Sequence, residues 1–109
     1  MESKTKPQMD DLVRSIGELA KARNQLAHQA EQRYAPEVEY VLRTQCRDPH
    51  RIERLLDGIL DFCFDPAMLR LYKKLCRYYF TIDLEATVSY VNAYREMWDE
   101  REEGLEGEE

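Results

Sequence analysis

Three consecutive amphipathic stretches between Asp48 and Trp98 constrain the fold of this chain more than any other feature of its sequence. Each stretch opens on an aspartate: Asp48 and Asp65 each precede a proline, and Asp83 precedes Leu84. An aspartate side chain caps free backbone N–H groups in the first helical turn, and its charge suits the positive end of the helix dipole. Proline is tolerated at the first helical position, where its missing donor has no partner anyway. The three aspartates therefore predict three helix starts.

Apolar residues after each start recur at intervals of three and four positions, the period of a helix with one buried side. The first set is Ile52, Leu55, Leu56, Ile59, Leu60 and Cys63. The second set is Met68, Leu71, Tyr72, Leu75, Cys76 and Tyr79. The third set is Leu84, Val88, Val91, Tyr94 and Trp98. We therefore expect three helices that end near Phe64, Phe80 and Glu100, joined by very short links and packed as neighbours.

A longer amphipathic stretch precedes these three helices. Its apolar stripe predicts a helix over residues 9–33, packed through Met9, Leu12, Val13, Ile16, Leu19, Ala20, Ala27 and Ala30. Because Ala35 precedes Pro36 and is pushed out of the helical region, we expect the helix to break or kink there. A short helix over residues 36–45 should follow, with Val38, Val41 and Leu42 on its buried side.

Length and composition fit one domain with a charge imbalance at its end. The chain has 109 residues, of which 43% are hydrophobic and 35% charged, with a net charge of −6. This balance suits a modest single core. Seven of the 22 acidic residues but one of the 16 basic residues lie at 99–109, so the rest is neutral. We predict an all-α compact bundle of four main amphipathic helices plus one short helix over 9–100, with disordered residues 1–8 and a disordered acidic tail over 101–109.

Composition also bears on location and cofactors. No apolar run approaches the ~20 residues that span a bilayer, and the polar start lacks the apolar segment of a signal peptide. We therefore expect a cytoplasmic protein with no membrane partner. Cys46, Cys63 and Cys76 are odd in number, and two lie on apolar stripes, which favours reduced, packed thiols. Together with His50 they lack the paired short spacing of a structural zinc site, so we predict no metal and no cofactor.

The stretch from Pro66 to Ile82 contains no acidic residue and carries four basic residues on one helix face. A basic stripe flanked by aromatic residues suits contact with phosphates and bases. It suits an acidic protein partner or the chain's own tail equally well, and a solvated outer face is the simplest interpretation of the same charges. The predicted binding surface consists of Arg70, Lys73, Lys74, Arg77 and Tyr78.

The segment Arg23-Asn24-Gln25-Leu26-Ala27-His28 resembles the motif of HEPN-type ribonuclease toxins over six of the 109 residues. In that family the arginine and histidine lie at a dimer cleft and act on RNA without a metal. The resemblance implies that Arg23 would stabilise a phosphate and His28 would shuttle a proton. The two side chains lie about 140° apart around a helix, so a composite site would need two chains. In the alternative interpretation, Arg23 extends from a packed stripe or pairs with a carboxylate, and His28 is a surface residue.

No complete set of nucleophile, base and oxyanion donors can be assembled from these residues. We therefore expect a non-catalytic protein-interaction or regulatory module that acts through helix faces on another protein or on a second copy of itself. Two alternatives stay open. One is a divergent HEPN-like, metal-independent ribonuclease that uses Arg23 and His28. The other is a nucleic-acid-binding accessory protein that uses the basic helix face.

Overall fold

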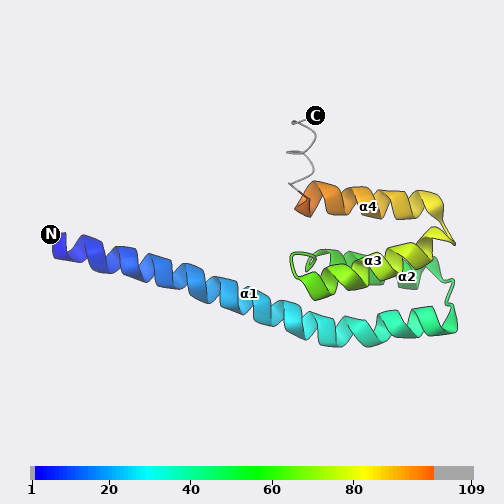
Figure 1. The fold of residues 1–109 in the computed structure, drawn as a ribbon, viewed down its shortest axis with the longest axis horizontal. Helices are drawn as coiled ribbons and strands as arrows, with labels where there is room; N and C mark the ends of the chain where they lie inside the picture. Colours follow the sequence, from blue (N-terminus) through cyan, green and yellow to red (C-terminus); the bar gives the residue numbers. More distant parts are fainter. Residues whose placement is uncertain (1, 100–109) are drawn as a thin grey trace.

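The computed structural model describes residues 2–99, with side chains from Met9 onward, and this part consists of four helices and no strand (Figure 1). The helices are α1 (Glu2–Thr44), α2 (Pro49–Leu60), α3 (Pro66–Phe80) and α4 (Leu84–Trp98). Helix α3 is central, because it packs against each of the other three, and α1 also packs against α2. The predicted all-α class is confirmed for the described residues, and the predicted acidic tail lies outside them.

All three predicted helix starts are confirmed. The Asp65 carboxylate accepts hydrogen bonds from the backbone N–H groups of Ala67 and Met68, both at 3.1 Å. Asp48 and Asp83 each cap their helix through one such bond. Each cap satisfies backbone donors that have no partner inside the helix. The caps therefore allow the chain to reverse direction within the short links 61–65 and 81–83.

Helix α1 differs from its prediction at both ends. It begins at Glu2, ahead of the start expected near Met9, and it runs through Pro36 to Thr44 without a break. The predicted separate helix over residues 36–45 is therefore wrong, because this segment is the last part of α1. Helix α1 curves in this region, as helices do at an internal proline (Figure 1).

Packing explains why Pro36 does not end α1. An internal proline removes one backbone hydrogen bond and crowds the preceding turn, at a cost of about 3 kcal/mol. Ala30 precedes the proline and Val38 and Val41 follow it, and all three are buried against the rest of the bundle. Burying a valine side chain stabilises by about 1.5–3 kcal/mol. The apolar contacts on both sides of Pro36 therefore outweigh the local cost of keeping the helix continuous.

The core lies between α2, α3 and the second half of α1. Its largest fully buried side chains are Tyr79, Ile52, Leu56, Ile59, Met68, Leu75, Val38 and Val41. Buried tyrosine retains a polar contact, since the Tyr79 hydroxyl donates to Glu53 Oε2 at 2.5 Å. None of the described helices combines the length and the apolar character needed to cross a membrane.

Helix α4 buries only part of its predicted stripe, because Tyr94 and Trp98 pack against the core whereas its aliphatic residues do not. Leu84, Val88 and Val91 are 53%, 47% and 40% exposed, so their predicted burial is wrong. The side that packs carries Tyr90 and Trp98, whose polar tips bond to α2. The Tyr90 hydroxyl donates to Asp57 Oδ1 at 2.9 Å, and Trp98 Nε1 donates to the Leu60 carbonyl at 2.8 Å. Aromatic side chains bury more area than valine and bring hydrogen bonds, so they decide how α4 is oriented.

The first half of α1 projects beyond the other three helices (Figure 1). Every residue from Met9 to Leu26 is exposed, and the first buried residue after Met9 is Ala27. The other helices therefore pack against the second half of α1 and leave residues 9–26 exposed to solvent.

Candidate interaction surface

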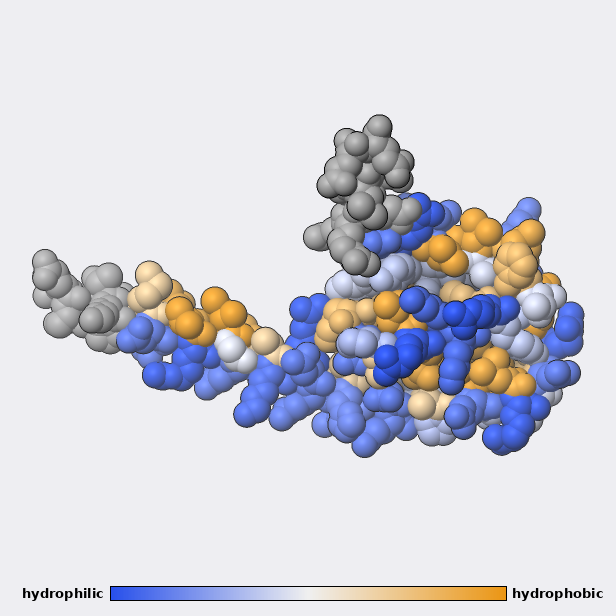
Figure 2. All heavy atoms as spheres, in the orientation of Figure 1, coloured by the Kyte–Doolittle hydropathy of each residue, from blue (hydrophilic) through white to orange (hydrophobic). Residues whose placement is uncertain are grey.

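The projecting half of α1 carries an apolar stripe that nothing in the described part of the chain covers. We call it the α1 stripe, and its members are Met9, Leu12, Val13, Ile16, Leu19 and Leu26. Their exposed fractions lie between 56% for Leu26 and 71% for Leu19. Figure 2 shows apolar surface gathered along one edge of the projecting helix, with hydrophilic surface along the opposite edge. The predicted burial in the chain's own core is therefore wrong for the first six residues of the predicted stripe, Met9, Leu12, Val13, Ile16, Leu19 and Ala20.

The α1 stripe continues the face by which α1 enters the core. At about 100° per residue, Met9, Ile16 and Ala20 point to the same side of the helix as Ala27 and Val38. Ala27 and Val38 are fully buried against the bundle. One continuous packing face is thus covered over its second half and open over its first half.

Apart from Arg23, the charged residues of the projecting half lie away from the α1 stripe. Asp10, Asp11, Arg14, Glu18 and Lys21 are all exposed and lie on the other side of the helix. Arg14 and Asp11 pair across one turn at 3.3 Å. This separation of polar and apolar sides is typical of a helix that packs along one side.

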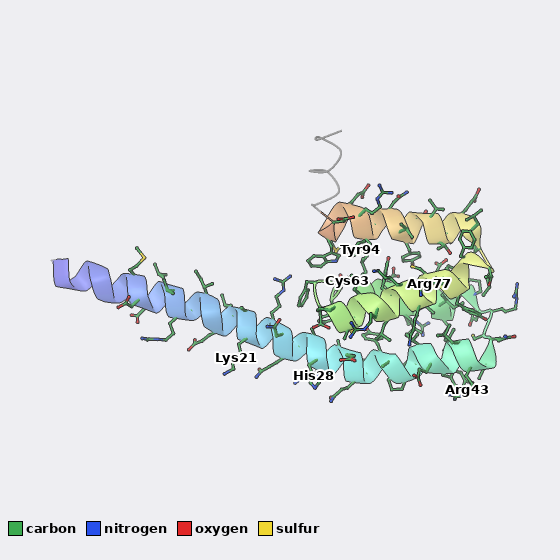
Figure 3. The ribbon with its side chains drawn as sticks, viewed as in Figure 1. Lys21, His28, Arg43, Cys63, Arg77 and Tyr94 are labelled. Atoms are coloured by element: carbon green, nitrogen blue, oxygen red, sulfur yellow. The ribbon has the colours of Figure 1, made fainter. Side chains whose placement is uncertain are left out.

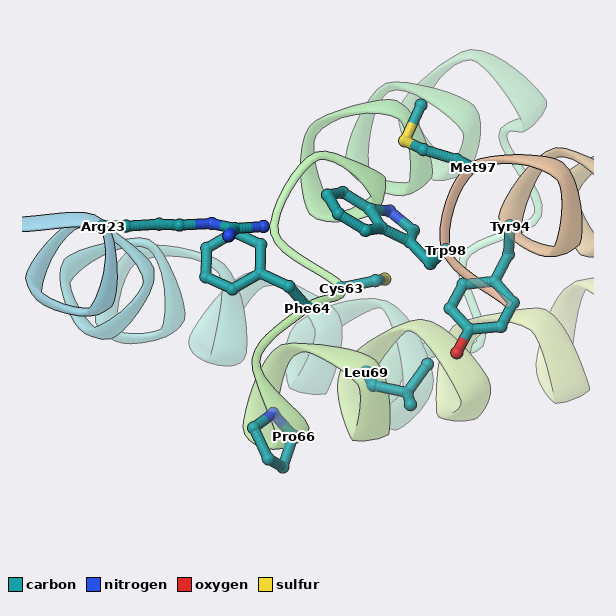
Figure 4. A pocket seen from close by; sticks show the side chains of 8 residues that line it. All are labelled: Arg23, Cys63, Phe64, Pro66, Leu69, Tyr94, Met97 and Trp98. Atoms are coloured by element: carbon teal, nitrogen blue, oxygen red, sulfur yellow. The ribbon is translucent and has the colours of Figure 1, made fainter. Parts of the chain in front are cut away.

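An aromatic hollow lies where the α1 stripe meets the bundle. The guanidinium of Arg23 stacks over the Phe64 ring at 3.8 Å from its centroid, and lies 5.8 Å from the Trp98 ring (Figure 4). Phe64 and Trp98 contact each other with centroids 5.7 Å apart. The hollow has a volume of about 510 Å³ and is lined by Arg23, Cys63, Phe64, Pro66, Leu69, Tyr94, Met97 and Trp98.

Arg23 therefore has a structural partner that the sequence analysis did not identify. The guanidinium gains a cation–π contact, which contributes about 0.5–1 kcal/mol at an exposed site. The sequence signal was the position of Arg23, a charged residue inside an apolar stripe. Its aromatic partners lie 41 and 75 positions away, at Phe64 and Trp98, and no local pattern connects residues so distant in the chain.

The structure does not bring Arg23 and His28 together within one chain. Arg23 points toward Phe64, whereas His28 lies on an exposed side of α1 (Figure 3). The His28 ring is next to its own helix neighbours, with Nε2 3.4 Å from Gln32 Nε2 and Nδ1 4.0 Å from Glu31 Oε1. The arrangement of this pair at a two-chain site stays a prediction.

The predicted basic surface divides into exposed charges and an engaged tyrosine. Arg70, Lys73, Lys74 and Arg77 are exposed on the outer side of α3, where Figure 3 labels Arg77. Among the described residues, no carboxylate pairs with these four side chains. Tyr78 is half-buried, and its hydroxyl donates to the Cys46 carbonyl at 2.8 Å. Tyr78 thus ties α3 to the α1–α2 link, while the four basic side chains are free to contact a partner.

Two of the three cysteines are buried in the core. Cys63 and Cys76 are buried, and burial raises the pKa of the Cys63 thiol to about 12 and that of Cys76 to about 11. Their predicted role as packed thiols is confirmed. Cys46 is half-buried and His50 is exposed. Within residues 9–99, no three His, Cys, Asp or Glu side chains are grouped closely enough to hold a metal ion.

Comparison with known proteins adds no relative to this picture. No family model matches the chain, and neither a curated protein nor a solved structure matches it. The fold and its surfaces therefore define the class, an all-helical bundle with a projecting amphipathic helix (Figure 1).

Proposed function

We propose that this protein is a non-catalytic protein-interaction module that docks through the α1 stripe. The observation that carries the proposal is the exposure of six large apolar side chains on one side of a projecting helix. Contiguous apolar surface of this kind marks interaction sites on proteins that otherwise cover their apolar faces.

The energetics of helix formation support an interaction role. A helix in a protein draws most of its stability from packing of its apolar side, because isolated helices are marginal in water. The projecting half of α1 has no such packing within residues 9–26, although its sequence has the required side. A partner that covers the α1 stripe supplies this missing packing, so binding and ordering of the helix reinforce each other.

The size of the surface sets the expected strength of binding. Six apolar side chains that are each more than half exposed amount to about 600–700 Å², and burial contributes about 25 cal/mol per Å². The resulting gross gain of about 15 kcal/mol is offset by roughly 4–15 kcal/mol of lost translational and rotational freedom. A net affinity in the micromolar range is the expected outcome.

Photo-crosslinking tests the proposal. A photoreactive phenylalanine analogue replaces Leu12 on the α1 stripe, and the control carries the same analogue at Gln25 on the opposite side of α1. We expect protein–protein crosslinks from position 12, to a second copy or to another protein, and far fewer from position 25. The experiment is done in the cells that express the protein. Equal crosslinking from the two positions, or none from either, would contradict a docking role for the α1 stripe.

The basic side of α3 favours a second candidate function, contact with nucleic acid. Its four exposed basic side chains face outward without a carboxylate partner among the described residues. Phosphate contacts release counterions, so binding should weaken steeply as salt rises. We expect binding of single-stranded RNA to fall by tenfold or more between 50 and 200 mM salt, and Lys73→Glu to weaken it further, in a fluorescence anisotropy titration. Binding that ignores both salt and Lys73→Glu would exclude this surface.

A further inference from the structure

We infer that the α1 stripe packs against the α1 stripe of a second copy of this chain, with the two helices antiparallel. The inference rests on the proposed function and specifies its partner.

The spacing is that of a coiled coil. Met9, Leu12, Ile16, Leu19, Arg23 and Leu26 follow one another at alternating intervals of three and four positions. This is the repeat of the two core positions in a heptad, which place side chains along a seam facing a partner helix. The seam is 18 residues long from Met9 to Leu26, about 27 Å at 1.5 Å per residue.

The residues that flank the seam permit self-association. Between Met9 and Leu26, one flank carries Val13 and Ala20, and the other carries Ser15 and Ala22. Flanking positions usually carry the charges that select a partner or reject a second copy of the same chain. Here they are uncharged and mostly small, so two copies can approach closely without facing like charges.

Arg23 decides the orientation of the two helices. It is the single charged residue of the seam between Met9 and Leu26. In a parallel pair, equivalent residues face each other, so Arg23 would meet the partner's Arg23 and the two positive charges would repel. In an antiparallel pair that uses the full seam, Arg23 faces the partner's Leu12, Ile16 faces the partner's Leu19, and Met9 faces the partner's Leu26.

The antiparallel pairing also completes the aromatic hollow. Leu26 and the Arg23–Phe64 stack lie where the stripe meets the bundle. In the antiparallel register, the partner's Met9 and the partner's Leu12 reach this end of the seam. A methionine thioether packs favourably against aromatic rings. In a symmetric dimer this contact occurs twice, because the first residues of each α1 stripe cover the aromatic hollow of the other copy.

The area suits a reversible dimer. Two copies of the α1 stripe bury on the order of 1,200–1,400 Å², at the lower end of the range for specific interfaces. A two-fold arrangement brings the same patch of both copies together, and the contact closes without forming a chain of copies.

Sedimentation equilibrium of the full chain across about 1–300 µM tests the dimer. We expect a monomer–dimer equilibrium in this range for the unaltered protein. Ile16→Glu places a charge in the middle of the seam and should weaken the dimer at least a hundredfold. Gln25→Glu adds the same charge on the opposite side of α1 and should change the dimerisation constant less than threefold. Both side chains are exposed, so the circular dichroism of the bundle should be retained in both variants.

A third variant tests the orientation. Leu12→Glu places a carboxylate opposite the partner's Arg23 in the antiparallel pair, but opposite another carboxylate in a parallel pair. We expect Leu12→Glu to weaken dimerisation at least tenfold less than Ile16→Glu does, and Leu12→Glu/Arg23→Glu to abolish it. Equal damage from Leu12→Glu and Ile16→Glu would overturn the antiparallel pairing.

If sedimentation equilibrium showed a monomer at every concentration, the inference that a second copy covers the α1 stripe would be overturned. If the position-12 photo-crosslink then captured a different protein, the interaction function would stand with another partner. If neither experiment gave a complex, both the inference and the proposed function would fail.

Discussion

Two glycines inside helices have opposite surroundings, and each predicts a different effect of adding a methyl group. A Cβ on Gly58 of α2 would overlap the Tyr34 side chain of α1, with Cζ only 2.7 Å and Cε1 only 3.2 Å away. A Cβ on Gly17 meets nothing within 4 Å. Gly58 therefore permits the close approach of α1 and α2, whereas Gly17 only weakens a projecting helix.

We expect Gly58→Ala to lower the free energy of unfolding by about 1–2 kcal/mol, because crowding the Tyr34 ring exceeds the gain in helix propensity. Gly17→Ala is the matched control and should raise the helical content of the projecting half, worth up to about 1 kcal/mol. Urea unfolding followed by circular dichroism measures both. Equal stability of Gly58→Ala and the unaltered chain would show that the Tyr34 ring moves aside freely.

The residues at which α2, α3 and α4 begin were predictable from the sequence. The side of each helix that is buried was only partly predictable. Asp48, Asp65 and Asp83 act on backbone donors two or three positions away, so their effect is readable in the sequence. The orientation of α4 was only partly predictable, because the single predicted stripe joined Tyr94 and Trp98, which pack against the core, to valines that are exposed. Contacts of Tyr90 and Trp98 with α2 decided which side is buried.

Helix α1 shows the same limit on a larger scale. The local preference of the residue before Pro36 predicted a break or a kink, and buried contacts on both sides of the proline keep the helix continuous although it curves there (Figure 1). The sequence correctly placed the apolar residues of positions 9–26 on one side of the helix, and all of them are exposed. Its periodicity carries no information on whether the covering surface lies in the same chain, so the prediction of a core role failed there.

Across the whole molecule, the buried thiols and tyrosines predict loss of stability at alkaline pH. Burial raises the pKa of Cys63 from 9.0 to about 12 and that of Cys76 from 9.0 to about 11. Burial likewise raises the pKa values of Tyr72, Tyr79 and Tyr90. The unfolded chain then loses these protons at lower pH than the folded chain, so their stabilising contribution is complete below pH 9.0 and declines as pH rises above it.

We expect the melting temperature to fall progressively as the pH is raised from 9 to 11, measured by differential scanning calorimetry. A Cys63→Ala/Cys76→Ala variant removes two of the titrating groups and should show a shallower fall from its own starting temperature. A melting temperature that stays constant up to pH 11 would contradict the raised pKa values.

The sequence by itself determined the helical class, the three capped starts, the short links between them and the sidedness of α1, because these depend on interactions between residues a few positions apart. The tertiary structure alone decided that α1 is continuous, which side of α4 is buried, that Arg23 stacks on Phe64, and that the first half of the α1 stripe is open. Each of these depends on contacts between residues far apart in the chain, whose free energies exceed the local preferences that a sequence pattern reports.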